Sequence, residues 1–227
     1  MFTLSIVMAV YNEKNSLLQV LEKIDRVDIG IKKEIIIVDG CSTDGTREIL
    51  RGIRRKDIKI FFEEKRNGKG YALRSGFALA CGDIILIQDA DLEISPADYP
   101  FLLKPILEGR ASVVYGSRFL RGRGKTNIIS YLGNRLVTTV ANILFGCRLT
   151  DIETCYKIFK SEIIKNMQFR CSGFDFDAEL TASILKNRFK ILEIPITYNP
   201  RNYQEGKKLH WTVGITSLLA ILRCKFR

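Results

Sequence analysis

The hydrophobic and polar positions in the first half of the chain follow two alternating patterns. Short apolar runs predict strands at residues 4–10, 33–40, 58–64 and 83–91, of which the first two are expected to be buried. Segments with apolar residues at helical spacing lie between them, at residues 13–24, 46–55 and 68–80. This βα rhythm predicts an α/β fold with a mostly parallel central sheet and helices on both faces.

The second half continues the pattern less regularly. Ser95 is a plausible N-cap, with Pro96 at the first helical position, and a strand is expected at residues 111–118. A basic, glycine-rich loop precedes a long amphipathic helix at residues 128–146. The remainder mixes strand and helix without a break in composition, so we expect one domain over residues 1–227.

Polar residues follow several of the predicted strands. The first strand runs into Tyr11 and Glu13, the second ends at Asp39, and the fourth ends at Asp89 and Asp91. Ligands of open α/β sheets bind beyond the carboxyl ends of the strands. We therefore expect these side chains to converge on one crevice.

Three carboxylates stand at alternate positions at the end of the fourth strand: Asp89, Asp91 and Glu93. On an extended strand, residues two apart point the same way, so the three acids would line one face. Carboxylate oxygens suit Mg²⁺ or Mn²⁺, which also take substrate phosphates as ligands. The alternative is a solvated acidic loop, but acids after a wholly apolar strand in a basic protein favour a metal site.

Two glycine-containing turns are further candidates. Asp39 opens the stretch VDGCSTDGT at a strand end, where a carboxylate can accept hydrogen bonds from a nucleotide base or ribose, although the stretch can also be a plain strand–turn–helix. Lys69 lies in the basic turn NGKG before a helix, and helix N-termini favour phosphate. This turn lacks the frame of a Walker loop, and it makes Lys69 a candidate donor-site residue.

Charge and cysteine content limit the kinds of partner and the cellular compartment that we expect for this protein. The net charge of +11 and pI of about 9.4 favour polyanionic partners: nucleic acid, anionic lipid surfaces or phosphorylated substrates. The cysteines form no C-x-x-C pair, which indicates reduced thiols in a cytoplasmic protein. We expect neither a signal peptide nor a membrane-spanning helix, because no stretch of 18 residues is both strongly apolar and free of charge.

The order of several motifs resembles a known enzyme family. The stretches AVYNE, VDGCSTDGT, NGKGYALRSGFALACGD, QDADLE and VVYGSRF look like a family 2 glycosyltransferase of the GT-A (Rossmann-like) fold. Later stretches, including FDFDAEL and EIPITYNPRNYQEGKKLHW, resemble the dolichyl-phosphate mannose synthase and dolichyl-phosphate glucosyltransferase group. The chain departs from the family at Ala9, often Pro, at Gly40, usually a second Asp, and at Glu93, Gln in mannose synthases.

The resemblance implies a role for each matching position. The nucleotide would be surrounded by Ala9, Tyr11, Glu13 and Asp39. The metal on its diphosphate would be held by Asp89, Asp91 and Glu93. Arg118 and Arg135 would face the acceptor phosphate, although Arg118 could instead pair only with a strand-end acid. Arg201 and Lys208 would come from a C-terminal loop over the diphosphates; Lys207 and Lys208 could also be plain surface lysines, and His210 beside Trp211 is expected to pack.

The implied reaction is an inverting, metal-dependent transfer of a hexose, from GDP-mannose or UDP-glucose, to a polyprenyl (dolichyl or undecaprenyl) phosphate. An ionised phosphate attacks without a general base, which fits a sequence with no convincing His–carboxylate pair. The alternative is a soluble family 2 enzyme that adds a sugar to a glycan hydroxyl, with Asp151 or Glu153 as base.

A lipid acceptor implies contact with a membrane. The helices at 128–146 and 212–227 have apolar faces with basic flanks and could lie in the interface, or could pack in the core. We expect a peripheral protein at the cytoplasmic membrane face. Nucleic-acid binding is not expected, because the acidic strand ends would repel phosphate without a metal, and the glycine-rich N-terminal loop of a nucleotidyltransferase is missing.

Overall fold

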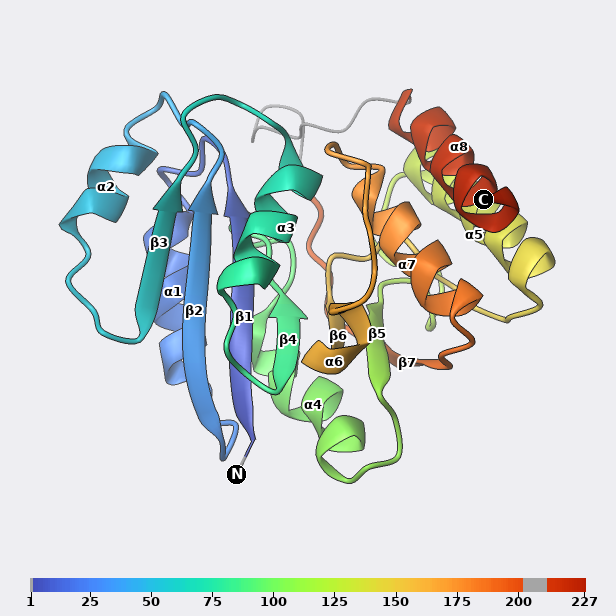
Figure 1. Ribbon diagram of the computed structural model, residues 1–227, viewed down its shortest axis with the longest axis horizontal. Helices are drawn as coiled ribbons and strands as arrows, with labels where there is room; N and C mark the ends of the chain where they lie inside the picture. Colours follow the sequence, from blue (N-terminus) through green and yellow to red (C-terminus); the bar gives the residue numbers. More distant parts are fainter. Residues whose placement is uncertain (1, 202–211) are drawn as a thin grey trace.

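A seven-stranded sheet forms the centre of the computed structural model, which describes residues 2–201 and 212–227 (Figure 1). The strand order is β3-β2-β1-β4-β6-β5-β7, and only β6 runs antiparallel to its neighbours. The strands are β1 (Thr3–Val10), β2 (Lys32–Asp39), β3 (Ile58–Phe62), β4 (Ile84–Ile87), β5 (Val113–Ser117), β6 (Lys157–Lys160) and β7 (Ile191–Pro195). The predicted α/β fold with a mostly parallel sheet is confirmed.

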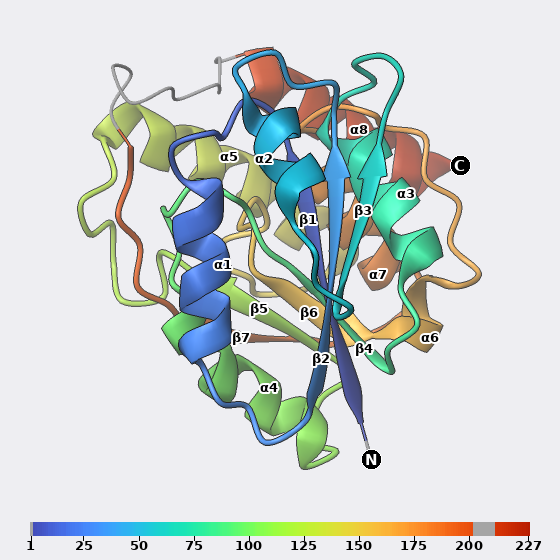
Figure 2. The same ribbon diagram turned by 90° about the vertical axis from the view of Figure 1, so that its left-hand side faces the viewer.

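Helices cover both faces of this sheet (Figure 2). Those described are α1 (Leu17–Arg26), α2 (Thr46–Gly52), α3 (Lys69–Leu79), α4 (Tyr99–Leu107), α5 (Ile128–Phe145), α6 (Ser161–Ile164), α7 (Phe176–Lys186) and α8 (Thr212–Phe226), with a 3₁₀ turn at Pro96–Asp98. Ser95 caps that turn by accepting the Ala97 N–H, as predicted. Helices α1 and α4 lie on one face, and α3 and α7 on the other.

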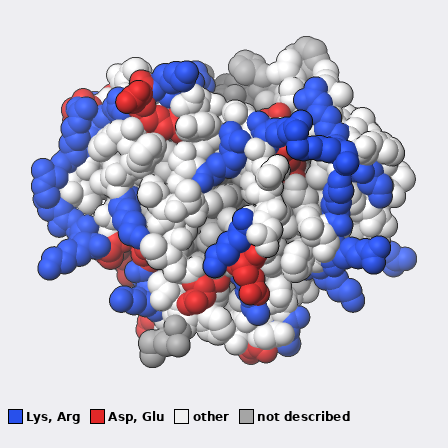
Figure 3. Space-filling model, in the orientation of Figure 1, with Lys and Arg blue, Asp and Glu red and all other residues white. Residues whose placement is uncertain are grey.

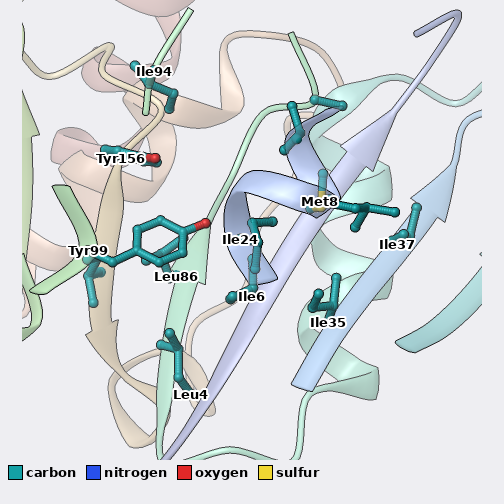
Figure 4. Packing of buried hydrophobic residues seen from close by; sticks show 14 of the residues in the cluster. Leu4, Ile6, Met8, Ile24, Ile35, Ile37, Leu86, Ile94, Tyr99 and Tyr156 are labelled. Atoms are coloured by element: carbon teal, nitrogen blue, oxygen red, sulfur yellow. The ribbon is translucent and has the colours of Figure 1, made fainter. Parts of the chain in front are cut away.

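Alternation along the strands divides the core into two halves. Leu4, Ile6 and Met8 of β1 pack with α1 and α4, and Figure 4 shows them facing Ile24 and Tyr99. Val7 and Ala9 of β1 point the other way, towards α3 and α7. Both faces of the strand are therefore buried, which explains why residues 6–10 of β1 form an unbroken apolar run.

Two further helices lie outside α7. Side chains of α5 and α8 meet α7 in a separate cluster that includes Val137, Ala178 and Ile221. Among the described residues, α5 alone is long and apolar enough to cross a membrane by length and composition, and only 22% of its length is buried. Helix α5 meets this criterion although it contains Arg135, and the sequence analysis did not single it out as such a segment.

A glycine sets the distance between α3 and the sheet. A β carbon added at Gly76 would lie 2.4 Å from Cγ1 of Val7, a fully buried residue of β1. Helix α3 can lie this close to the strands only because position 76 has no side chain.

We predict that Gly76→Ala lowers the free energy of unfolding by about 1–3 kcal/mol, because overpacking outweighs the better helix propensity of Ala. Gly133→Ala is the matched control: Gly133 is also inside a helix, but nothing lies within 4 Å of an added β carbon. That control should be neutral or stabilise by up to about 1 kcal/mol. Urea unfolding of both variants measures the difference, and equal stabilities would contradict the close contact.

Candidate active site

The loops that leave β1 and β2 are joined to each other at the carboxyl edge of the sheet. The backbone N–H of Asn12 donates to Ser42 Oγ (2.9 Å), and Asn12 Oδ1 accepts the Thr43 N–H (2.8 Å). The Glu13 N–H donates to Thr46 Oγ1 (3.0 Å). These bonds hold the two loops together on one side of the candidate site, at the point where β1 lies between β2 and β4.

The predicted nucleotide residues lie together on this side of the candidate site. Ala9 pairs with Val38 in the parallel register, which places Asp39 beside the end of β1. Asp39 is fully buried, 2.8 Å from Arg47 Nε. The Arg66 guanidinium lies over the ring of Tyr11, 4.2 Å from the ring centre, in a cation–π contact. The sequence analysis did not identify Arg66 as a member of this group.

A second buried acid next to Asp39 was also missed. Glu63 follows β3, its N–H donates to the Asp39 carbonyl oxygen (2.9 Å), and its Oε2 accepts from Asn67 (3.0 Å). Its Oε1 is buried without a hydrogen-bond partner among the described residues. Burial raises the pKa of Glu63, and Asp39 raises it further. Glu63, like Asp39, is an acid at the end of a strand, but β3 is a partly exposed edge strand, so its sequence carries a weaker signal.

The acidic segment after β4 is a loop and not an extended strand end. Strand β4 stops at Ile87, and Gln88 Oε1 accepts the hydroxyls of Tyr99 (2.7 Å) and Tyr156 (2.8 Å). Leu92 has a positive φ of 63°. The alternation argument for the three acids was therefore wrong.

The described residues contain no group of three His, Cys, Asp or Glu side chains placed to hold a metal ion. Asp89 pairs with Lys69 (3.0 Å), and Glu93 accepts from the Tyr198 hydroxyl (3.0 Å). Asp91 lies between these two acids: burial raises its pKa to about 7, with repulsion from Asp89 and Glu93 as further causes. A buried carboxyl among acids fits a hard cation that takes one or two carboxylates and draws its other ligands from substrate phosphates.

Lys69 is a member of a buried chain of alternating charges. Its Nζ lies 3.0 Å from Asp89 and 3.4 Å from Asp177, and Asp177 pairs with the fully buried Lys157 (2.7 Å). Burial alone would lower the pKa of Lys69, but Asp177 and Asp89 outweigh it and raise this pKa well above its usual value. The charge of Lys69 is thus compensated by protein carboxylates, which corrects the simple view of a free phosphate-binding lysine.

The glycines around Lys69 serve packing. A β carbon at Gly68 would lie 2.3 Å from the Ser172 carbonyl oxygen, and one at Gly70 would lie 2.6 Å from Phe176 Cβ. These glycines therefore allow the start of α3 to pack closely against the start of α7 and the segment before it.

Residues 196–201 cross the front of the acidic loop. The Arg201 N–H donates to Glu93 Oε1 (2.8 Å), its Nε to the Asp91 carbonyl oxygen (2.5 Å), and a terminal nitrogen to Glu13 Oε2 (3.0 Å). Arg201 thus joins the end of β1 to the acidic loop and brings Glu13 and Asp91 together. Lys207, Lys208 and His210 lie outside the described residues.

Arg118 forms a two-point ion pair at the end of β5. Its Nε and a terminal nitrogen lie 2.7 and 2.8 Å from the two oxygens of Asp151, which also accepts from Asn134 of α5 (2.7 Å). Burial would raise the pKa of Asp151, but Arg118 outweighs it and lowers this pKa. Arg135, which was expected to face the acceptor phosphate together with Arg118, takes no part in this ion pair. Its neighbour Asn134 points inward, whereas Arg135 is exposed on α5.

Glu153 is the other carboxyl of this region. It is half-buried, and burial raises its pKa. Arg118 lowers the pKa and Asp151 raises it, so Glu153 lies within the field of that ion pair.

Two relatives of known function match nearly nine tenths of this chain. The chain is 30% identical over 205 residues to the low-salt glycan biosynthesis hexosyltransferase Agl6 of Haloferax volcanii, covering 88% of this chain and 48% of that protein. It is 28% identical to the dolichol-phosphate mannosyltransferase of Pyrococcus furiosus over 212 residues, 89% of this chain and 58% of that protein. The chain thus spans about half to three fifths of these relatives.

The fold matches solved structures over nearly the whole chain. Glucosyl-3-phosphoglycerate synthase from Mycobacterium tuberculosis, solved with Mn²⁺, UDP and glucosyl-3-phosphoglycerate, superposes with a TM-score of 0.76 at 22% identity, covering 99% of this chain and 80% of that one. Residues 5–168 match the family model described as glycosyl transferase family 2. The chain therefore belongs to glycosyl transferase family 2.

Proposed function

We propose that this protein transfers a hexose from a nucleotide sugar, GDP-mannose or UDP-glucose, to the phosphate of a polyprenyl lipid, with inversion at the anomeric carbon. The observation that carries the acceptor class is the ion pair of Asp151. Arg118 and Asn134 occupy both oxygens of this carboxylate, so it is not available as a general base. A phosphate acceptor is already ionised at neutral pH and needs no base.

The donor would bind between the ends of β1, β2 and β4. Asp39 and Glu63 supply buried carboxylates for the N–H groups of a base or the hydroxyls of a ribose, and the Tyr11–Arg66 pair gives a flat surface beside them. Similarity to the hexosyltransferase and mannosyltransferase relatives supports a sugar nucleotide as donor.

The diphosphate would lie at Asp91. A divalent cation, Mg²⁺ or Mn²⁺, bound there with the diphosphate supplies the positive charge that a leaving nucleoside diphosphate needs. Asp91 and Asp89 are the residues that would hold it, and Arg201 lies against the same loop through the Asp91 carbonyl oxygen. The Mn²⁺ and Mg²⁺ bound with UDP in the M. tuberculosis synthase support a divalent cation.

The acceptor phosphate would approach Arg118. Two of its five N–H groups go to Asp151, and its guanidinium lies 5.3 Å from the ring centre of Tyr198, beside the residues 196–201 that cross the acidic loop. An acceptor oxygen held there attacks the anomeric carbon from the side opposite the diphosphate. The new C–O bond forms as the bond to the diphosphate breaks, so an α-linked donor gives a β-linked lipid phosphate.

A hydroxyl acceptor is the second candidate, and one observation favours it. Glu153 is half-buried with a raised pKa, which is a common property of catalytic acids and bases. The synthase from M. tuberculosis was solved with phosphoglyceric acid, which carries both a phosphate and a hydroxyl. The two candidates differ in whether transfer depends on Glu153.

Asp91→Asn should abolish the thermal stabilisation that Mn²⁺ with GDP or UDP gives to the wild type.

The stability of the ligand-free variant checks that this loss is not caused by a damaged fold. With a pKa of about 7, Asp91 binds a proton more tightly in the folded than in the unfolded protein. Its contribution to stability therefore falls as pH rises from about 4 to about 7. The ligand-free variant should be no less stable than wild type at about pH 8, whereas a mutation that damages the fold would lower stability there. Asp28→Asn, at an exposed loop position, is the control.

The affinity of the wild type for Mn²⁺ with nucleotide should weaken below pH 7, because the proton on Asp91 competes with the cation. One competing proton predicts a loss of about tenfold per pH unit below the pKa. Titration calorimetry from pH 6 to 8 measures this slope, and a flat profile would show that Asp91 is not a ligand.

Glu153→Gln should keep at least about a tenth of the activity on polyprenyl phosphate, because the attacking oxygen is already ionised. Removal of a true general base costs about 10²–10⁴-fold in rate, so a loss of that size would establish the hydroxyl-acceptor alternative. The assay compares initial rates on a polyprenyl phosphate and on a panel of sugar acceptors. Asp151→Asn is unsuitable for this test, since it leaves the charge of Arg118 unpaired.

A further inference from the structure

The outer surfaces of α5 and α8 carry large apolar side chains that no part of the described chain covers. On α5 the exposed residues are Ile129, Leu132, Leu136 and Ile143, with Ile129 77% and Ile143 76% exposed. They recur every three to seven residues, on the side opposite the inward-facing Asn134, Val137 and Ala141. This outer stripe belongs to the one described helix that is also apolar enough to cross a bilayer.

Helix α8 adds a second stripe beside the first. Its exposed residues Ile215, Leu219, Leu222 and Phe226 repeat at three- and four-residue spacing, and Phe226 is 76% exposed. The opposite side of α8 packs through Ile221 into the cluster shared with α5 and α7. Figure 1 shows α5 and α8 next to each other at one side of the molecule, so the two stripes lie on neighbouring helices.

The charge around these stripes has one sign. Residues 119–150 contain five Lys or Arg and no Asp or Glu, and residues 212–227 contain three and none, in a chain of net charge +11. Arg121, Arg123 and Lys125 are exposed in the loop before α5, and Arg223 and Lys225 on the last turn of α8. Figure 3 shows blue and white atoms and little red on the side where α8 lies.

We propose that the outer face of α5 and α8, the α5–α8 face, docks on an anionic lipid surface. Apolar stripes with basic flanks and no acid match the acyl boundary and the anionic headgroups of a leaflet. A protein partner would need acids spread along the whole face, and a second copy of this chain would bring basic residues against basic residues. The proposal concerns docking alone, and its failure would leave the proposed reaction in place.

The placement of this face suits a lipid substrate. Asn134, in the second turn of α5, donates to Asp151, and Asp151 holds Arg118 at the end of β5. The inner side of α5 is therefore part of the site, and its outer side is the docking face. Because the inner side is fixed to the domain by Asn134 and Val137, α5 lies along the surface of the leaflet and does not cross it.

The test measures binding of the full chain to vesicles by co-sedimentation. Wild type should bind vesicles with about one-third phosphatidylglycerol, and bind neutral phosphatidylcholine vesicles at least about tenfold more weakly. Salt raised to about 0.5 M should weaken binding, since it screens the headgroup charge. Equal binding to the two kinds of vesicle, or none to either, would overturn the proposal.

The double variant Ile129→Glu/Ile143→Glu should lose at least about tenfold in vesicle affinity, because two apolar anchors become anionic. Both side chains are three-quarters exposed, so folding should be unaffected, and thermal unfolding checks this. The matched control is Phe101→Glu, which replaces a 67% exposed aromatic on α4, on a different part of the molecule. Equal losses in the control and the double variant would overturn the assignment to this face.

Two further measurements separate docking from catalysis and from self-association. Transfer to a short, water-soluble polyprenyl phosphate without vesicles should be the same in wild type and double variant, whereas transfer to a long-chain acceptor in vesicles should fall with binding. A chain that binds vesicles but transfers to no phosphate acceptor would retain this proposal and refute the proposed reaction. A wild-type dimer that the double variant abolishes, with no vesicle binding by either, would identify the face as a protein interface and overturn docking.

Discussion

The arrangement of the site depends on the buried chain of charges Asp89–Lys69–Asp177–Lys157. A fully buried lysine such as Lys157 is tolerable only with a partner, because desolvation of an ammonium group costs several kcal/mol. Asp177 provides that partner and lies in the first turn of α7. Lys69 lies in the first turn of α3, so the chain of charges holds two helices and the acidic loop in a fixed relation. Removing any member would leave an unpaired charge in the interior.

The same principle explains why the acidic loop keeps its shape without regular structure. Gln88 is fully buried and accepts from two tyrosine hydroxyls, while its amide donates to the Asp89 carbonyl oxygen (2.8 Å). On the other side, Arg201 and Tyr198 contact Asp91 and Glu93. The loop is thus held from the sheet, from α3 and from the segment after β7. This support from three directions allows three carboxylates to remain close together despite their repulsion.

The sequence predicted the elements well and the contacts of the site poorly. Continuous apolar runs identify strands such as β1 because both faces are covered, and this holds without knowledge of the partners. The end of β4 was misjudged because it depends on Gln88 finding Tyr99 and Tyr156, and Tyr156 comes from a distant part of the chain. Lys69 was likewise judged by its local turn, whereas Asp177 compensates its charge. Ion pairs between distant segments leave no periodic signal, so only the fold reveals them.

The balance of charge at the candidate site bears on the order in which the ligands of the proposed reaction would bind. Lys69 and Arg118 are each already paired with buried carboxylates, and Arg201 with Glu13. Asp91, in contrast, has a raised pKa because burial and two neighbouring acids oppose its ionisation. A bare diphosphate would therefore meet a negative field near Asp91. In the proposed reaction, a cation bound with its nucleotide would reverse that field, and only then would an anionic acceptor be favoured beside it. The proposed reaction would thus have the cation and donor bind before the acceptor phosphate.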